Sequence, residues 1–333
     1  MPSNAATTTR GLAGRVFLVD EFGVIAALVA LVLVIGAFHP SFLEVAQLVD
    51  VVEQAAFVGI LACGMTYLLA MRELDLSVGS TYALSIVGAA TLMQSGWNPW
   101  LGAVAGVVLG GFLGTVNGII GEVVKIPSII TTLGTLSLYR GLALAISDGK
   151  NVADLPRQHD FFTVIGGDLF GVPVPVWVLL ITALTLTIVL RATRFGTTVR
   201  AIGSNPEAAR FSGISLPRTR IQVLALSGAL AGLSGMLTLA FFASGDPTIG
   251  SGYELQAIAA AIIGGTPLRG GSATVVGAMF GAILLGVVNS GLVYFDVPIN
   301  WSAFATGAVI LAAVSLDSLL RRRRRGQRSG LAL

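Results

Sequence analysis

The sequence predicts an all-α protein that crosses a membrane about ten times, and three observations predict it. Of its 333 residues, 54% are hydrophobic and 11% are charged, whereas soluble domains carry about 25% charged residues. Charge-free runs recur along the chain, several of them near the roughly 20 apolar residues that a spanning helix needs. The 42 glycines are typical of a bundle in which small residues let helices approach closely.

Ten helices are expected, one for each apolar run. The first lacks a small-residue cleavage site, so we expect it to be retained rather than removed as a signal peptide. The third and eighth are expected to be short, broken or re-entrant, near Asp75–Ser80 and Gly264–Gly271. Irregular backbone at membrane depth is tolerated only where protein covers it. The ten expected ranges are 21–38, 51–71, 77–94, 99–121, 126–146, 173–191, 221–243, 254–265, 273–293 and 299–319.

The basic residues predict the orientation. An even number of spans puts both termini on one side, and cytoplasmic loops of membrane proteins are enriched in Lys and Arg. With both termini inside, the cytoplasmic segments hold 17 of the 20 basic residues. The chain then divides into a cytoplasmic tail (1–20), a membrane domain (21–319) and a basic cytoplasmic tail (320–333). The membrane domain has an external loop at 147–172 and a cytoplasmic loop at 191–220.

The run Arg321–Arg325 is expected to lie near anionic lipid, because it directly follows a membrane helix. Nucleic acid is not an expected partner. The single cysteine excludes an intramolecular disulfide and a cysteine metal site. The chain has no G-x-x-x-x-G-K-[ST], H-E-x-x-H or G-x-S-x-G motif. It is therefore predicted not to be an enzyme by itself.

A short helix is expected in the cytoplasmic loop. Asn205 can cap it, and Pro206 suits its first position. Glu207 complements the positive end of the helix dipole, and Gly213 can end the helix in a left-handed conformation. Because one or two turns do not persist alone in water, this helix must pack against something.

Three stretches resemble one family of membrane proteins. Glu207-Ala208-Ala209, followed by Gly213, resembles the coupling-helix motif of permease subunits of bacterial ATP-binding-cassette (ABC) importers. The stretches 74–80 (LDLSVGS) and 263–271 (IGGTPLRGG) resemble elements of the ribose/xylose/autoinducer-2 branch, over roughly residues 51–317. One departure is Arg72-Glu73-Leu74, where the family usually has Gly-Gly-Ile. Permeases for nucleosides or branched-chain amino acids are more distant relatives and an alternative.

The resemblance implies a multi-pass subunit, in the bacterial inner membrane, of an importer for a monosaccharide, sugar alcohol or related solute. This chain would bind no cofactor, since ATP and Mg²⁺ are used by a partner ATPase. The implied partners are a second permease chain (identical or paralogous), a cytoplasmic ABC ATPase and an extracytoplasmic solute-binding protein. The residues implied in coupling to the ATPase are Asn205, Glu207, Ala208, Ala209 and Gly213.

Candidates for the solute path are polar residues at membrane depth, which are costly there and therefore functional candidates, and aromatic residues. Alternatively, the asparagines bond across helices, the aspartate orders its turn, and the aromatic rings pack. An ion-gradient-driven carrier is a second possible function, but such carriers usually need ionisable groups near the midplane. The path candidates are Phe57, Asp75, Asn117, Asn289 and Trp301.

Overall fold

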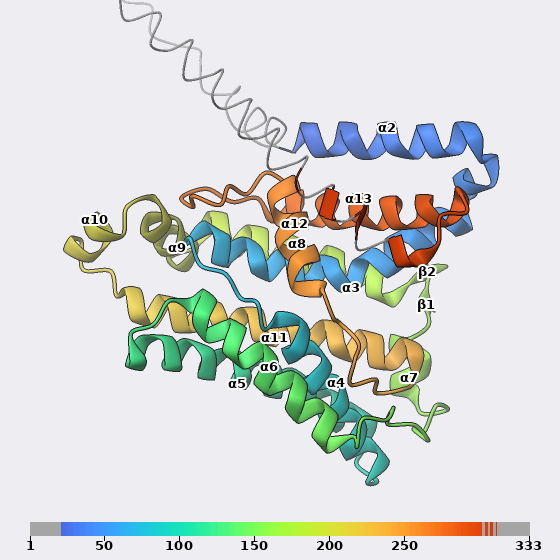
Figure 1. The fold of residues 1–333 in the computed structure, drawn as a ribbon, viewed down its shortest axis with the longest axis horizontal. Coiled ribbons are helices and arrows are strands. Elements are labelled where there is room, and N and C mark those ends of the chain that lie inside the picture. The colour runs from blue at the N-terminus through green and yellow to red at the C-terminus, as the bar shows by residue number, and fades with distance from the viewer. Residues whose placement is uncertain (1–20, 302–303, 306, 309–310, 312–333) are drawn as a thin grey trace, which may run out of the picture.

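Long helices run side by side along the longest axis of the molecule in the computed structural model (Figure 1), which describes residues 21–301, 304–305, 307–308 and 311. The sheet found in these residues is one hairpin, β1 (Asp168–Leu169) with β2 (Val172–Pro173). The helices are α2 (Phe22–Phe38), η1 (Pro40–Leu43), α3 (Val45–Ala70), α4 (Val78–Gln94), α5 (Pro99–Val124), α6 (Ser128–Ile146), α7 (Asp160–Ile165), α8 (Val174–Ala192), α9 (Arg194–Ser204), α10 (Pro206–Phe211), α11 (Leu216–Phe242), α12 (Tyr253–Ile263), α13 (Val275–Tyr294) and η2 (Ile299–Trp301).

The all-α membrane architecture is confirmed. Nine of the ten expected ranges are helices in the described part of the chain, with ends that differ from the expected ones by at most six residues. The tenth range, 299–319, and the tails 1–20 and 320–333 lie mostly or wholly outside the described residues. Within the described residues, the helices long and apolar enough to cross a membrane are α3, α5, α6, α8, α11 and α13, and α2 and α12 are shorter apolar helices.

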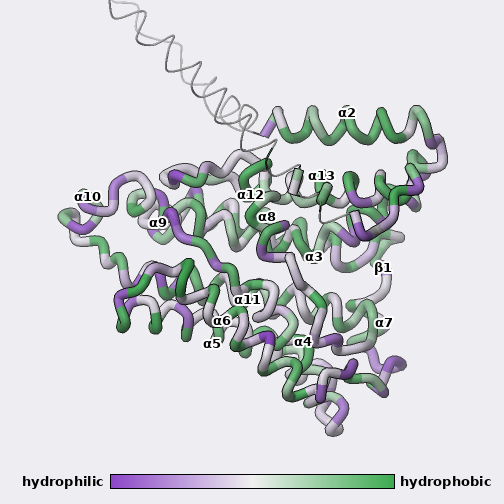
Figure 2. The backbone as a smooth tube through the Cα atoms, viewed as in Figure 1, coloured by the Kyte–Doolittle hydropathy of each residue, from purple (hydrophilic) through white to green (hydrophobic). Residues whose placement is uncertain are grey.

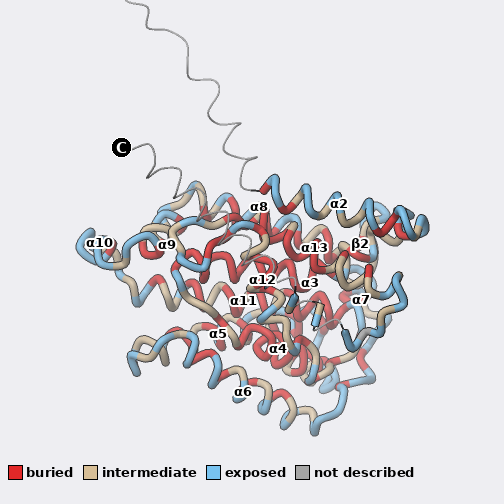
Figure 3. The backbone as a smooth tube through the Cα atoms, turned by 45° about the horizontal axis from the view of Figure 1, so that its top comes forward, coloured by how far each residue is buried: buried red, intermediate tan, exposed pale blue. Residues whose placement is uncertain are grey.

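The molecule has two distinct ends (Figure 1). The α10 end carries α9 and α10, and the hairpin end carries α7, β1 and β2. Hydrophilic residues gather on α10 and in the loops near α7, whereas α2 is hydrophobic along its length (Figure 2). Buried residues concentrate on α3, α4 and α11, while α6 is largely exposed (Figure 3). Exposed apolar side chains such as Phe112, Leu138 and Ile181 are those expected of a surface that faces lipid.

Two helices begin inside the bundle instead of at one of its ends. The chain leaves α3 at the α10 end, returns through the irregular residues 71–77 and only then starts α4. It likewise leaves α11 at the hairpin end and passes through 243–252 before α12. The two starting points meet, since the rings of Tyr82 and Tyr253 have centroids 5.4 Å apart. From there α4 and α12 run toward opposite ends (Figure 1).

The predicted break near Asp75–Ser80 is therefore confirmed. The eighth helix is short, as expected, since α12 has 11 residues and ends directly before Gly264, but the break inside the bundle is not at 264–271. Residues 264–271 lie after the end of α12, close to α9, where the amide of Gly271 donates to the carbonyl of Ala70 at 2.9 Å. The interruption inside the bundle falls at 243–252 instead. We call residues 71–77 the re-entrant segment.

Glycines set the close approach of α5 to α11. Gly106, Gly110, Gly114 and Gly118 recur every four residues and so share one face of α5. A Cβ added to Gly110 would collide with the carbonyl oxygen of Gly228 and lie 2.9 Å from the amide nitrogen of Gly232. The two backbones are in contact at this point, as in the small-residue helix pairs of membrane proteins.

We predict that Gly110→Leu prevents this contact and lowers the amount of folded protein. Overpacking lowers the free energy of unfolding by about 1–3 kcal/mol even where neighbouring side chains can move aside. Gly134→Leu is the matched control, since nothing lies within 4 Å of the Cβ position at Gly134 on α6. The measurement is the amount and thermal stability of monodisperse protein in detergent. Equal stability of the two variants would contradict close backbone packing of α5 on α11.

Candidate functional site

A cavity of about 650 Å³ lies between α3, α11, α12 and α13. Its walls combine aromatic faces with amide groups, and the hydroxyl of Tyr82 pairs with Oγ1 of Thr238 at 2.5 Å on its inner side. Neither lysine, arginine nor histidine contributes to the lining, although two carboxylates do. We call it the outer cavity. Its polar and aromatic lining residues are Asp50, Glu53, Gln54, Phe57, Tyr82, Thr238, Phe241, Phe242, Tyr253, Gln256 and Asn289.

Two of the five predicted path residues line this cavity. Phe57 contributes its ring, whose centroid lies 6.0 Å from that of Phe241. The Oδ1 atom of Asn289, a residue that lines the cavity, is buried and accepts no hydrogen bond from the described residues. Trp301 stands apart from the cavity, exposed to solvent, with its ring edge-on to Phe304.

Asp75 and Asn117 instead share a fully buried polar network. Oδ1 of Asp75 accepts from the amide and the hydroxyl of Ser77, at 3.0 and 2.6 Å, and Oδ2 accepts from Ser227 at 3.1 Å. The amide of Asn117 donates to Oγ of Ser77 at 2.8 Å and accepts from the Tyr139 hydroxyl at 2.9 Å. Asp75 thus orders its own turn through Ser77 and ties the re-entrant segment to α11 through Ser227. Asn117 ties that segment to α5 and α6 through Ser77 and Tyr139.

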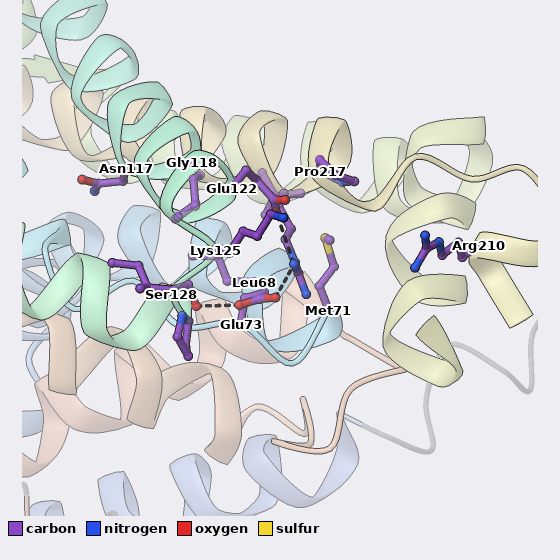
Figure 4. A pocket seen from close by; sticks show the side chains of 16 residues that line it. Leu68, Met71, Glu73, Asn117, Gly118, Glu122, Lys125, Ser128, Arg210 and Pro217 are labelled. Carbon is purple, nitrogen blue, oxygen red and sulfur yellow. Dashed lines mark hydrogen bonds and ion pairs between the residues drawn. The ribbon is translucent and has the colours of Figure 1, made fainter. Parts of the chain in front are cut away.

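A second cavity, of about 720 Å³, lies toward the α10 end (Figure 4). Arg220, in the first turns of α11, lies between two carboxylates. Its Nε is 2.7 Å from Oε1 of Glu73, and its Nη1 donates to Oε1 of Glu122 at 3.0 Å. Ser128 donates to the other oxygen of Glu73 at 2.5 Å. Asn117 lies in the wall of this inner cavity, together with Lys125 and Arg210.

The predicted helix in the cytoplasmic loop is present as α10. Oδ1 of Asn205 accepts from the amide of Ala208 at 3.1 Å, and Pro206 is the first helical residue. Gly213 has a φ of +81°, the left-handed conformation expected after the helix. Of the two alanines, only Ala208 is exposed, because Ala209 packs into the core of this chain. The prominent exposed group is Phe211, whose exposed fraction is 92%.

Sequence reasoning missed helix α9 and two polar anchors. The signal for α9 was Thr193, whose Oγ1 caps the helix by accepting from the amide of Gly196 at 3.2 Å. In the sequence, Arg140 is a single charged residue within the expected helix 126–146. It donates to the carbonyls of Pro247 and Ile249, at 2.7 and 2.8 Å, and so holds the irregular backbone before α12. Nothing in the sequence around Tyr139 distinguishes it from an aromatic residue that only packs, although its hydroxyl bonds to Asn117.

Helices that start at mid-bundle and cavities that face opposite ends define a polytopic membrane protein of the transporter class. The chain belongs to the family described as the permease component of branched-chain amino acid transport systems, which it matches over residues 47–314. No solved structure matches it.

Curated relatives match over nearly their full lengths. The chain is 35% identical to the ribose import permease protein RbsC of Bacillus subtilis, over 90% of this chain and 93% of the relative. It is 32% identical to the L-arabinose ABC transporter permease protein AraH of Azospirillum brasilense, over 98% and 96%. It is 34% identical to the D-allose transport system permease protein AlsC of Escherichia coli, over 90% and 92%.

We predict that two asparagine substitutions act on different properties, one on solute uptake and the other on the stability of the fold. Asn289→Leu removes a cavity amide whose Oδ1 has no bond to lose, so uptake should fall about tenfold, or about 1.4 kcal/mol, with folding preserved. Asn117→Leu removes two buried hydrogen bonds, one to Ser77 and one from Tyr139, each worth about 0.5–1.5 kcal/mol, so the thermal stability of the folded protein should fall. Thermal stability in detergent and solute uptake separate the two effects. A destabilised Asn289→Leu protein would contradict this assignment.

Proposed function

We propose that the chain is the membrane-spanning subunit of an ABC importer that carries a neutral monosaccharide or sugar alcohol into the bacterial cytoplasm. The observation that carries the proposal is the chemistry of the outer cavity. Aromatic faces suit the apolar side of a sugar ring, and amides suit its hydroxyls. An amino acid would bring an ammonium group, which the two acids of the lining suit, but also a carboxylate, for which the lining holds no basic partner. The relatives named for ribose, arabinose and allose support the same solute class.

The proposed orientation places the α10 end in the cytoplasm. Arg194, Arg200, Arg210 and Arg218 lie in the loop at that end, whereas Asp154, Asp160 and Asp168 lie in the loop at the hairpin end. This distribution follows the positive-inside rule. A solute-binding protein then delivers solute to the hairpin end, and a second permease chain completes the membrane part.

The energy comes from a partner ATPase, in this proposal, because the chain has no phosphate-binding loop. An ion-coupled carrier is disfavoured, since the buried carboxylate of Asp75 is already bonded on both oxygens. We propose that α10 docks on the ATPase, with Asn205, Pro206 and Gly213 shaping it and Glu207, Ala208 and Phe211 making the contact. Ala209 serves by holding α10 on its own chain.

We predict ATP-dependent uptake of labelled pentose by proteoliposomes that hold this chain, its ATPase and its binding protein, with ionophores collapsing all ion gradients. Leucine at the same concentration should not accumulate. The measurement is radiolabel retained after filtration, with and without internal ATP. Accumulation that needs an ion gradient but no ATP would overturn the proposal, and accumulation of leucine alone would favour the amino acid alternative.

We predict that Phe211→Ala weakens binding of the ATPase, because a central aromatic contact contributes about 2 kcal/mol, or about 30-fold in Kd. Phe170→Ala is the matched control, since Phe170 is 91% exposed at the opposite end. Co-purification of the ATPase with each variant is the measurement. An equal effect of both changes would show that exposed phenylalanines act through solubility rather than docking.

A further inference from the structure

Arg72 and Glu73 lie at the start of the re-entrant segment, directly after Met71. The backbone at Arg72 has a φ of +66°, a left-handed conformation that glycine adopts freely and a long side chain adopts at a cost. The conformation of this turn thus favours glycine, but the residue is arginine. Its side chain therefore has a role that the turn itself does not require.

The contacts of Arg72 give that role. Its Nε donates to the carbonyl of Gly203 at 2.7 Å, and its Nη2 donates to the carbonyl of Ser204 at 2.9 Å. These are the last carbonyls of α9, where the helix dipole favours a cation. The next residue along the chain is Asn205, which caps α10. Arg72 thus binds the cytoplasmic loop immediately before α10, the helix that is proposed to dock on the ATPase.

Glu73 binds the same loop at a point that follows α10 in the chain. Its carboxylate pairs with Arg220 at 2.7 Å and accepts from Ser128 at 2.5 Å (Figure 4). Arg220 lies in the first turns of α11, which α10 leads into. The cytoplasmic loop is therefore attached to the re-entrant segment at two points that flank α10, through adjacent residues of that segment.

The re-entrant segment leads from these attachments into the buried network. Asp75 follows two residues later with its bonds to Ser77 and Ser227. The amide of Leu76 donates to Oγ1 of Thr132 at 3.1 Å. From the loop to the start of α4, the connection thus runs through six residues of irregular backbone, Arg72 to Ser77.

We propose that Arg72 and Glu73 are positioning residues that carry the movement of α10 to the re-entrant segment, and through it to the start of α4. The inference rests on the proposed function, since it needs an ATPase that moves α10. It assigns to these two residues a direct link between the cytoplasmic loop and the start of α4.

Arg72→Gly tests the link without disturbing the turn, because glycine is the residue that the left-handed backbone prefers. A spectroscopic label at Leu76→Cys, in a Cys63→Ala background, reports the state of the re-entrant segment in the purified complex with its ATPase. We expect the ATP-induced change of the label signal to be lost in Arg72→Gly, uptake to fall at least about tenfold, and ATPase co-purification to stay within about twofold. Arg72→Lys should restore part of the response, since it keeps a cationic donor.

Glu73→Gln should give a weaker loss in the same direction, because it removes the charge that faces Arg220. The control is Arg218→Met, which removes an exposed arginine from the same loop and should leave both signal and uptake unchanged. An unaltered label response and uptake in Arg72→Gly would overturn the inference, as would a loss matched by an equal loss of ATPase binding. Failure of the unmodified complex to import any sugar would instead count against the proposed function.

Discussion

Backbone that leaves the helical conformation inside a membrane must find its hydrogen-bond partners within the protein, and this constraint organises the whole bundle. The chain breaks in this way at the re-entrant segment and again at residues 243–252. Asp75 supplies acceptors at the first break, and Arg140 supplies donors at the second. Both side chains are ionisable, and both are bonded to irregular backbone. The helices around them are arranged so that these two groups can reach it.

Close helix packing makes that coverage possible. The face of α5 that carries glycine every four residues lets α11 approach until the two backbones touch, which brings Ser227 and Asn117 within reach of the re-entrant segment. A larger residue at Gly110 would move α11 away and leave the buried carboxylate with fewer partners. The packing of apolar surfaces and the satisfaction of polar groups are therefore one requirement in this bundle.

Sequence patterns predicted most helices because apolar runs of the right length have few other uses, and they predicted the cap and the stop of α10 because Asn205 and Gly213 act locally. They did not predict α9, because its glycines are typical of a loop. In the structure, Gly203 packs directly against the backbone of Ala70. They also could not separate the roles of Asn117 and Asn289. Both are asparagines in apolar helices. Only the tertiary structure bonds one to Ser77 and Tyr139 and leaves Oδ1 of the other, in the lining of the outer cavity, without a hydrogen bond from the described residues.

The same arrangement explains why the start of α4 separates the two cavities. Tyr82 lines the outer cavity, while Ser77, five residues earlier, bonds to Asn117 in the wall of the inner one. A little over one turn of helix, with its partner Thr238 on α11, therefore stands between the two sides. Because α4 begins at mid-bundle, irregular backbone joins its first turn to the α10 end, and a shift of that backbone need not break the helix. A continuous spanning helix in the same place would have to move as a whole.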